Sequence, residues 1–245
     1  MAASKYIHIF NFHKSFGRIE AFRRMLAIFK EIDVFDYVNR VDTRTISSGP
    51  YSNFNYMPYW PVFTSVCLEM MRQSHNYYLS AIRYSNYDNK TVFIDLGSGA
   101  GKTPIMAAKL KKFDFSVGVE IDHSLHFRFQ KNVDSLGLNS EILCHLGNVE
   151  DSNSISRLID ELHQRGFTRE NTTYFLFNKN SYSKSVLNNS LKLLEKNFSS
   201  IIYMYQNPVH HETLLNRGFE EFGRDSKLNS AHKNYKYILY KKEVS

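Results

Sequence analysis

From residue 91 onward, short apolar segments alternate with longer segments of helical periodicity. The short segments are rich in β-branched and aromatic residues, which is typical of strands buried on both faces. They predict strands at 91–96, 115–120, 141–145, 172–178 and 200–206, with helices near 102–112, 124–136, 154–164 and 183–195. Such an alternation indicates a parallel sheet whose strands are joined by crossover helices.

The pattern changes after the fifth predicted strand. A short helical stretch near 211–216 precedes FEEFGR and NYKYILYKK, which we interpret as two strands joined by the polar loop DSKLNSAHK. Because this connection is short, the two strands are expected to pair antiparallel. The predicted fold class is α/β, with a doubly wound, mostly parallel seven-stranded sheet, helices on both faces and an antiparallel C-terminal strand pair.

The first 88 residues follow a different pattern from the rest of the chain. GRIEAFRRMLAIFKEI has apolar residues at helical spacing, and PVFTSVCLEMMRQ predicts a second helix with Pro61 in its first turn. The stretch between these segments is rich in turn-forming and aromatic residues. We interpret 1–88 as a helical and aromatic cap on the ligand edge of the sheet, with a purely structural extension as the alternative. The predicted domains are therefore 1–88 and 89–245.

Composition restricts the class of protein without deciding its function. A chain of 245 residues with 42% hydrophobic content can bury the core of one domain. The formal net charge of +7 permits a nucleic-acid partner, but the basic residues are spread along the chain rather than clustered. The two cysteines, Cys67 and Cys144, are too few for a disulfide framework or a cysteine zinc site. Without a leader-like segment or a membrane-length apolar run, we expect a cytoplasmic protein with no membrane partner.

The segment FIDLGSGAGKT, at the end of the first predicted strand, is the candidate ligand-binding loop. Its last residues resemble a phosphate-binding P-loop, but Leu96 stands where that motif requires its first glycine. The carboxylate of Asp95, at the strand tip, would also repel a polyphosphate. The dinucleotide pattern G-x-G-x-x-G fails as well, because its third glycine falls on Lys102 or Pro104.

The pattern that does fit is Asp-x-Gly-x-Gly-x-Gly, formed by Asp95, Gly97, Gly99 and Gly101, with Ser98 inside it. S-adenosylmethionine carries an ammonium and a sulfonium near its reactive end. A carboxylate at the strand tip therefore attracts this ligand, whereas it repels phosphate. Glycines in the turn let the backbone approach the ligand closely.

On this motif the sequence resembles the class I, seven-strand S-adenosylmethionine-dependent methyltransferases, from about residue 91 to the end. The resemblance implies that Asp95 contacts the methionine part of the cofactor, above a turn formed by the glycines. It also implies methyl transfer to an undetermined small molecule or protein side chain. A P-loop-like nucleoside triphosphate hydrolase and a non-catalytic nucleic-acid-binding or cofactor-binding protein remain as alternatives, because short motifs also occur by chance.

Three other strand ends supply candidate cofactor residues. Glu120 ends the second predicted strand roughly twenty residues after the loop, a spacing typical of ribose-binding acids, whereas Asp122 fits a helix cap. The resemblance makes Asn148, after the third strand, a candidate for adenine binding, with a turn role as the alternative. Asn178 ends the fourth strand in NKNS, which lacks the two prolines of amino-adenine methyltransferases. This departure weakens a hypothesis of nucleic-acid base methylation.

A looser resemblance connects the chain to seven-strand histone-lysine methyltransferases and to small bacterial class I enzymes of unassigned substrate. The bacterial enzymes carry VDT and Tyr-x-Pro segments, which match residues 41–43 and 56–58, so the cap is predicted to contact the cofactor through Tyr56. We interpret His210 and His211 as surface residues that open a helix. No catalytic residue and no metal ligand is assigned, since methyl transfer mainly requires alignment of donor and acceptor.

Overall fold

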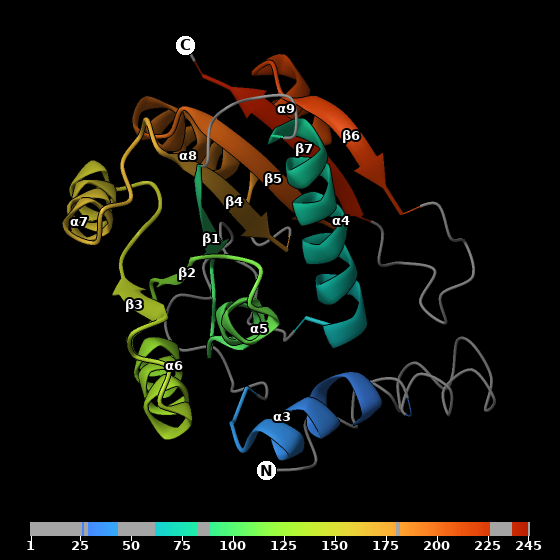
Figure 1. The fold of residues 1–245 in the computed structure, drawn as a ribbon, viewed down its shortest axis with the longest axis vertical. Helices are drawn as coiled ribbons and strands as arrows, with labels where there is room; N and C mark the ends of the chain where they lie inside the picture. The colour runs from blue at the N-terminus through green and yellow to red at the C-terminus, as the bar shows by residue number, and fades with distance from the viewer. Residues whose placement is uncertain are drawn as a thin grey trace.

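The structure is a computed structural model that describes residues 26, 29–43, 62–82, 89–179, 182–225 and 237–244. Tyr56 and most of the aromatic segment around it lie outside the described residues. The described chain forms three layers, with a central sheet between two sets of helices (Figure 1). In the part that the structure describes, no helix has the length and apolar character that crossing a membrane would require.

The central sheet has seven strands in the order β3-β2-β1-β4-β5-β7-β6. The strands from β1 to β5 are parallel, and β7 pairs antiparallel with both β5 and β6. These pairings confirm the fold class and the antiparallel C-terminal pair expected from the sequence. The strands are β1 (Lys90–Leu96), β2 (Phe115–Glu120), β3 (Ile142–Leu146), β4 (Thr172–Asn178), β5 (Ser200–Gln206), β6 (Glu220–Arg224) and β7 (Tyr237–Glu243).

Helices cover both faces of the sheet, because β1, β2, β4 and β5 are buried, and β1, β4 and β5 have apolar side chains on both sides. One face packs against α7 (Ser152–Gln164), α8 (Lys184–Asn197) and α9 (His211–Asn216). The other face packs against α4 (Thr64–Ile82), α5 (Lys102–Leu110) and α6 (His123–Leu136). The helices after β1 and β4 thus lie on opposite faces.

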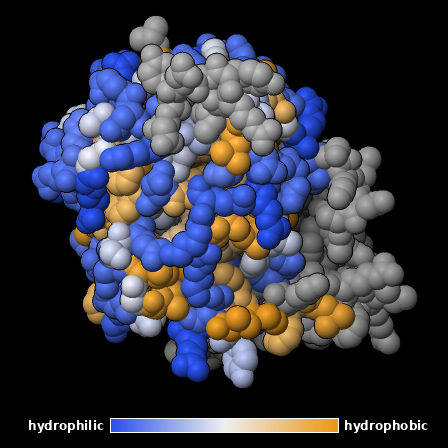
Figure 2. Space-filling view, viewed as in Figure 1, coloured by the Kyte–Doolittle hydropathy of each residue, from blue (hydrophilic) through white to orange (hydrophobic). Residues whose placement is uncertain are grey.

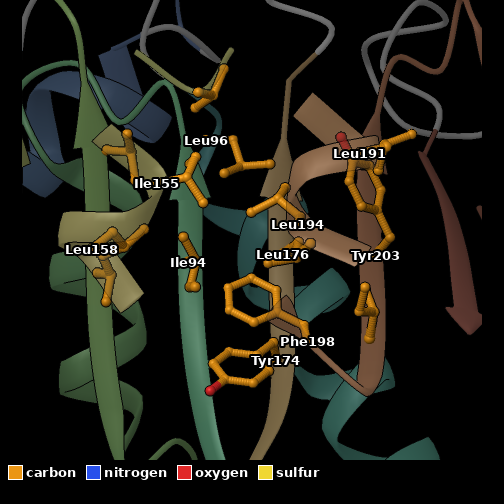
Figure 3. Packing of buried hydrophobic residues seen from close by; sticks show 14 of the residues in the cluster. Ile94, Leu96, Ile155, Leu158, Tyr174, Leu176, Leu191, Leu194, Phe198 and Tyr203 are labelled. Atoms are coloured by element: carbon orange, nitrogen blue, oxygen red, sulfur yellow. The ribbon is translucent and has the colours of Figure 1, made fainter. Parts of the chain in front are cut away.

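The core on the α7–α9 face is continuous from strand to strand (Figure 3). Ile94, Leu176 and Tyr203 project from three strands toward the leucines of α8. Tyr174 stacks on Phe198 with ring centroids 3.8 Å apart. Full burial of one such side chain stabilises a fold by about 1.5–3 kcal/mol, so this core fixes the sheet rigidly beneath its carboxyl edge.

Helix α4 is longer than the sequence predicts and occupies a different place. It covers a face of the sheet, where Cys67, Met70 and Met71 are fully buried, so this helix matches the alternative of a structural extension. Near its carboxyl end, the Tyr78 hydroxyl donates to the Asn89 carbonyl just before β1. The amino end of α4 therefore lies at the carboxyl edge of the sheet.

The π-helix η1 (Phe29–Asp33) and α3 (Val34–Asn39) lie at the carboxyl edge, beside α5 (Figure 1). The first predicted helix, GRIEAFRRMLAIFKEI, spans residues 17–32, so η1 overlaps its end and α3 lies beyond it. Most of that helix lies outside the described residues. Phe29, Tyr37 and Val38 are exposed, and apolar side chains gather along the lower margin of the surface in Figure 2. The division into domains at residue 88 stays a prediction.

Candidate functional site

The glycine loop lies at the carboxyl end of β1, between strands whose following helices turn to opposite faces. Open α/β sheets bind ligands at such a switch point. Gly97, Gly99 and Gly101 have φ values of 94°, 56° and 85°, in the left-handed region that favours glycine. The amides of Gly97 and Ser98 both donate to the Val119 carbonyl, at 2.9 and 3.0 Å, which ties the turn to β2.

Two glycines allow the loop to pack on a buried aromatic ring. A Cβ atom at Gly101 would lie 1.9 Å from the Phe129 ring of α6. A Cβ atom at Gly118 in β2 would lie 2.4 Å from the same ring and 2.7 Å from Ser98 Oγ. Gly118 has a negative φ and belongs to no motif, so sequence reasoning did not single it out. The position of the loop thus depends on the fit around Phe129.

Asp95 is buried at the end of β1, on the α4 and α5 side of the sheet. The Thr103 hydroxyl of α5 donates a hydrogen bond to its Oδ2 atom. Burial raises the pKa of Asp95 well above its usual range, and the nearby Glu120 carboxylate raises it further, while Lys179 acts in the opposite direction. The strand tip therefore holds a carboxylate whose ionised form is poorly compensated by the protein.

Glu120 ends β2 and anchors the glycine loop directly. Its Oε2 accepts from the Gly99 amide at 2.7 Å, and its Oε1 accepts from the amides of Ile121 and Asp122 at 2.9 and 2.8 Å. Burial raises the pKa of Glu120 despite these bonds. A carboxylate has about four acceptor positions, so about one remains for a ribose hydroxyl. A contact of the carboxylate to both hydroxyls of a ribose would need one of these bonds to break.

Asp122, the competitor of Glu120, and Asn148, the adenine candidate, both make local hydrogen bonds. Asp122 caps α6, because its Oδ1 accepts from the amides of Ser124 and Leu125 at 2.8 and 3.1 Å, which confirms the predicted cap. Asn148 forms a turn after β3, where its Oδ1 accepts from the Glu150 amide at 2.9 Å. The adenine-binding role of Asn148 stays a prediction.

Asn178 joins β4 to β1 across the switch point. It is fully buried, and its Nδ2 donates to the Leu96 carbonyl at 3.2 Å. Its Oδ1 and the Ser98 Oγ are buried without a hydrogen-bond partner in the part of the chain described. Buried polar atoms are normally satisfied, so these two atoms are places where a ligand could supply the missing partner.

Lys102, the residue that gives the loop its P-loop appearance, points away from the loop's ligand side. Its Nζ donates to the carbonyls of Glu31 and Val62 at 2.5 and 2.9 Å, and it lies 4.9 Å from the centroid of the Phe35 ring. Burial lowers its pKa to about 8. With Lys102 bonded to the amino-terminal segment and Thr103 bonded to Asp95, the residues that would hold phosphate and magnesium in a P-loop are engaged by protein. The structure gives the hydrolase alternative no support.

Replacing Lys102 with Met should destabilise the protein by about 1–3 kcal/mol, because two buried carbonyls lose their donor. Urea unfolding measures this change, and amide hydrogen exchange should become faster in 29–43. The matched control is Lys109→Met, at an exposed lysine of the same helix that bonds Asn39, with an expected change of about 0.5 kcal/mol or less. Equal stability of the two variants would contradict the anchoring role.

Residues 41–43, the VDT segment, contact the loop through α6. Asn132 of α6 accepts from the Asp42 amide and donates to the Asp42 carbonyl, each at 3.0 Å. The same Asn132 amide donates to the Ala100 carbonyl inside the glycine loop at 3.0 Å. Asn132 lies in the middle of an amphipathic helix, where no sequence signal distinguishes it, and it was missed. The VDT segment is thus held next to the predicted cofactor loop.

The histidine pair lies at the start of α9. His211 begins α9 and lies 3.3 Å from Glu212, so the interpretation of the histidine pair as residues that open a helix is confirmed. Within the described ranges, no group of three or more His, Cys, Asp or Glu side chains is arranged to hold a metal ion.

Comparison with known proteins gives similarity in structure only. No protein-family model matches the chain, and no curated protein matches its sequence. The human methyltransferase 10 domain containing protein superposes with a TM-score of 0.51 at 14% identity, over 88% of this chain and 94% of that one. The METTL16 methyltransferase domain has a TM-score of 0.48 at 16% identity, over 87% and 81%. The B. subtilis m1A22 tRNA methyltransferase TrmK has a TM-score of 0.46 at 15% identity, over 72% and 66%.

The first of these similarities establishes the fold. With its strand order and its reversed seventh strand, the chain has the seven-strand, Rossmann-like class I methyltransferase fold. A shared fold leaves the reaction open, because function resides in the site rather than in the architecture.

Proposed function

We propose that this protein is an S-adenosylmethionine-dependent methyltransferase. The observation that carries the proposal is the pair of buried carboxylates, Asp95 and Glu120, beside a glycine loop at the switch point of the sheet. Burial raises the pKa of both carboxyls, and the charge of Glu120 raises the pKa of Asp95 further. A cationic ligand would relieve this repulsion, whereas a polyphosphate would increase it.

The residues around the loop have charges and hydrogen-bonding groups that suit the parts of this cofactor. Asp95 would attract the ammonium and sulfonium end, and the glycine turn would admit the ligand close to the backbone. Glu120 would accept one ribose hydroxyl, and Asn148 would bind the adenine. The unpartnered oxygens of Ser98 and Asn178 offer two more hydrogen-bonding positions. Tyr56 is proposed as a contact from the cap, outside the described residues.

When bound, the cofactor would supply an activated methyl group on a positively charged sulfur. The chain itself then has to orient the acceptor and exclude water, which can supply much of the rate enhancement. The acceptor is proposed to be a small molecule or a protein side chain. The dispersed basic residues do not favour nucleic acid as the substrate, and the proposed location is the cytoplasm.

Isothermal titration calorimetry tests the proposal with three ligands: S-adenosylmethionine, its demethylated product S-adenosylhomocysteine, and ATP with magnesium. We expect the first two ligands to bind at a one-to-one ratio with dissociation constants in the micromolar range, where about 8 kcal/mol of binding free energy is typical. ATP should not compete with them. Binding of ATP together with the absence of heat from both sulfur nucleosides would overturn the proposal.

A further inference from the structure

Asn132 is buried inside α6, and its side chain connects two segments that are far apart in the chain. Its Oδ1 accepts from the Asp42 amide, and its Nδ2 donates to the Asp42 carbonyl and to the Ala100 carbonyl, each at 3.0 Å. A carboxamide has two N–H donors and one acceptor oxygen, so all three groups are engaged. One side chain thus holds both the glycine loop and the amino-terminal segment, residues 29–43.

The Ala100 carbonyl depends on this donor. Ala100 is fully buried in the glycine loop, and a buried carbonyl needs a hydrogen-bond partner. The start of α5 cannot supply an amide four residues beyond it, because Pro104 has no N–H group. Amides of the loop are tied to β2 on its other side, so Asn132 fixes the side that faces α6.

The amino-terminal segment reaches Asn132 through a folded turn of its own. The Asp36 carboxylate accepts from the Thr43 amide at 2.9 Å and from the Thr43 hydroxyl at 2.5 Å, and both residues are buried. Val41 packs in the same core cluster as Phe129, the ring against which the glycine loop packs. The segment is therefore docked on α6 by apolar packing as well as by hydrogen bonds.

We propose that Asn132 is a positioning residue for the cofactor, and that it makes the binding shape of the glycine loop depend on the docking of residues 29–43. The inference rests on the proposed function and adds a regulation of the same site. Two bonds to Asp42 fix the plane of the carboxamide, which directs its second N–H at the Ala100 carbonyl. When the segment undocks, the side chain can rotate away and the loop loses this contact.

Coupling of this kind acts in both directions. If undocking of the segment weakens cofactor binding by some factor, bound cofactor must suppress undocking by the same factor. Couplings between two sites are typically about 5-fold to 150-fold, and we expect about 10-fold here. Bound ligand should therefore slow hydrogen exchange in the folded turn at 36–43.

Amide hydrogen exchange of the full chain, followed by mass spectrometry, tests the inference with S-adenosylhomocysteine as the probe. The rate at 36–43 is measured with and without saturating ligand in the wild type, in Asn132→Asp and in Thr43→Val. Asn132→Asp keeps the shape of the side chain but places an oxygen where the amide donates to two carbonyls. Thr43→Val removes the hydroxyl bond to Asp36 and leaves the contacts of Asn132 intact.

Both substitutions should make exchange at 36–43 faster in the free protein, since each removes hydrogen bonds of the segment. Bound ligand should slow this exchange about 10-fold in the wild type and in Thr43→Val, but it should not slow it in Asn132→Asp. A residue that only stabilised the fold would leave the effect of the ligand unchanged. The contrast between the two variants therefore separates positioning from structural support.

Calorimetry measures the other side of the coupling. Asn132→Asp should bind S-adenosylhomocysteine about 10-fold more weakly than the wild type. Gln130→Glu makes the same chemical change at an exposed position of α6, and its affinity should equal that of the wild type. Asn132→Ala, which introduces no charge, should weaken binding as well and replaces the Asp variant if that variant does not fold.

Wild-type affinity in the Asn132 variants would overturn the role of Asn132 and leave the methyltransferase proposal intact. The same holds if the ligand does not slow exchange at 36–43 in the wild type, or if it slows exchange equally in Asn132→Asp. Failure of the wild type to bind both S-adenosylmethionine and S-adenosylhomocysteine would instead refute the proposed function on which this inference rests.

Discussion

Replacing Asp95 with Asn is expected to weaken S-adenosylmethionine binding by at least about 100-fold. A unit charge about 5 Å from a cationic ligand contributes about 3 kcal/mol at an effective dielectric constant near 20, and this contribution is lost in the variant. Asn keeps an oxygen that can accept from the Thr103 hydroxyl, so the local structure should persist. Calorimetric titration of the wild type and the variant measures the difference.

The same substitution should stabilise the protein without cofactor. Because burial raises the pKa of Asp95, the folded state binds more protons than the unfolded state between the ordinary pKa and the raised one. The contribution of Asp95 to the free energy of unfolding therefore decreases as the pH rises through that interval. Asn does not ionise, so the variant does not lose this stability. Thermal unfolding at neutral pH should therefore occur at a higher temperature in Asp95→Asn than in the wild type.

Asp122→Asn is the matched control for this substitution. Burial disfavours the ionised form of Asp122. Hydrogen bonds from Ser124 and Leu125 outweigh this effect and lower the pKa of the carboxyl. Asn is as good a helix cap as Asp, so stability should change by about 0.5 kcal/mol or less. Cofactor affinity should stay near that of the wild type. If Asp95→Asn bound S-adenosylmethionine as tightly as this control, the assignment of the loop would be wrong.

Replacing Gly101 with Ala should destabilise the fold by about 2–4 kcal/mol, because left-handed strain and overpacking add together. The residue has a φ of 85°, and the new methyl would lie 1.9 Å from the Phe129 ring. Phe129 is fully buried, so it cannot move aside without disturbing the core on that face. Urea unfolding measures the loss of stability, and cofactor binding should also weaken because the loop shifts.

Gly218→Ala separates the strain from the clash. Gly218 has a similar φ of 78°, but nothing lies within 4 Å of the position its Cβ would take. We expect a loss of about 1–2 kcal/mol there, from backbone strain alone. Equal losses at the two positions would show that Phe129 does not restrict the loop.

The fold could be predicted from the sequence because its strands are short, apolar and separated by clear helical segments. β1, β2, β4 and β5 are buried on both faces, so their sequences stand out from the amphipathic helices between them. The extent of α4 could not be predicted in the same way. Its buried positions include Cys67, Ser74 and Tyr78, a mixed set that gives a weak apolar periodicity.

The site was predictable only where a motif carries the chemistry. Asp95 and the three glycines stand at the strand tip because their spacing requires it. The bonds of Glu120 to Gly99 and Ile121 involve backbone amides, which leave no trace in the sequence. Lys102 belongs to a segment that resembles a P-loop, but it does not have the role of a P-loop lysine. Its side chain donates to the carbonyls of Glu31 and Val62, which are far away in the chain.

The most direct test of the central claim, recognition of a cationic sulfur nucleoside by the tip of β1, is a crystal structure with S-adenosylmethionine bound. We predict that its ammonium and sulfonium end lies against Asp95, and that its ribose lies toward Glu120. A structure with the ligand elsewhere, or a structure with ATP whose phosphoryl oxygens lie against Asp95, would contradict the account.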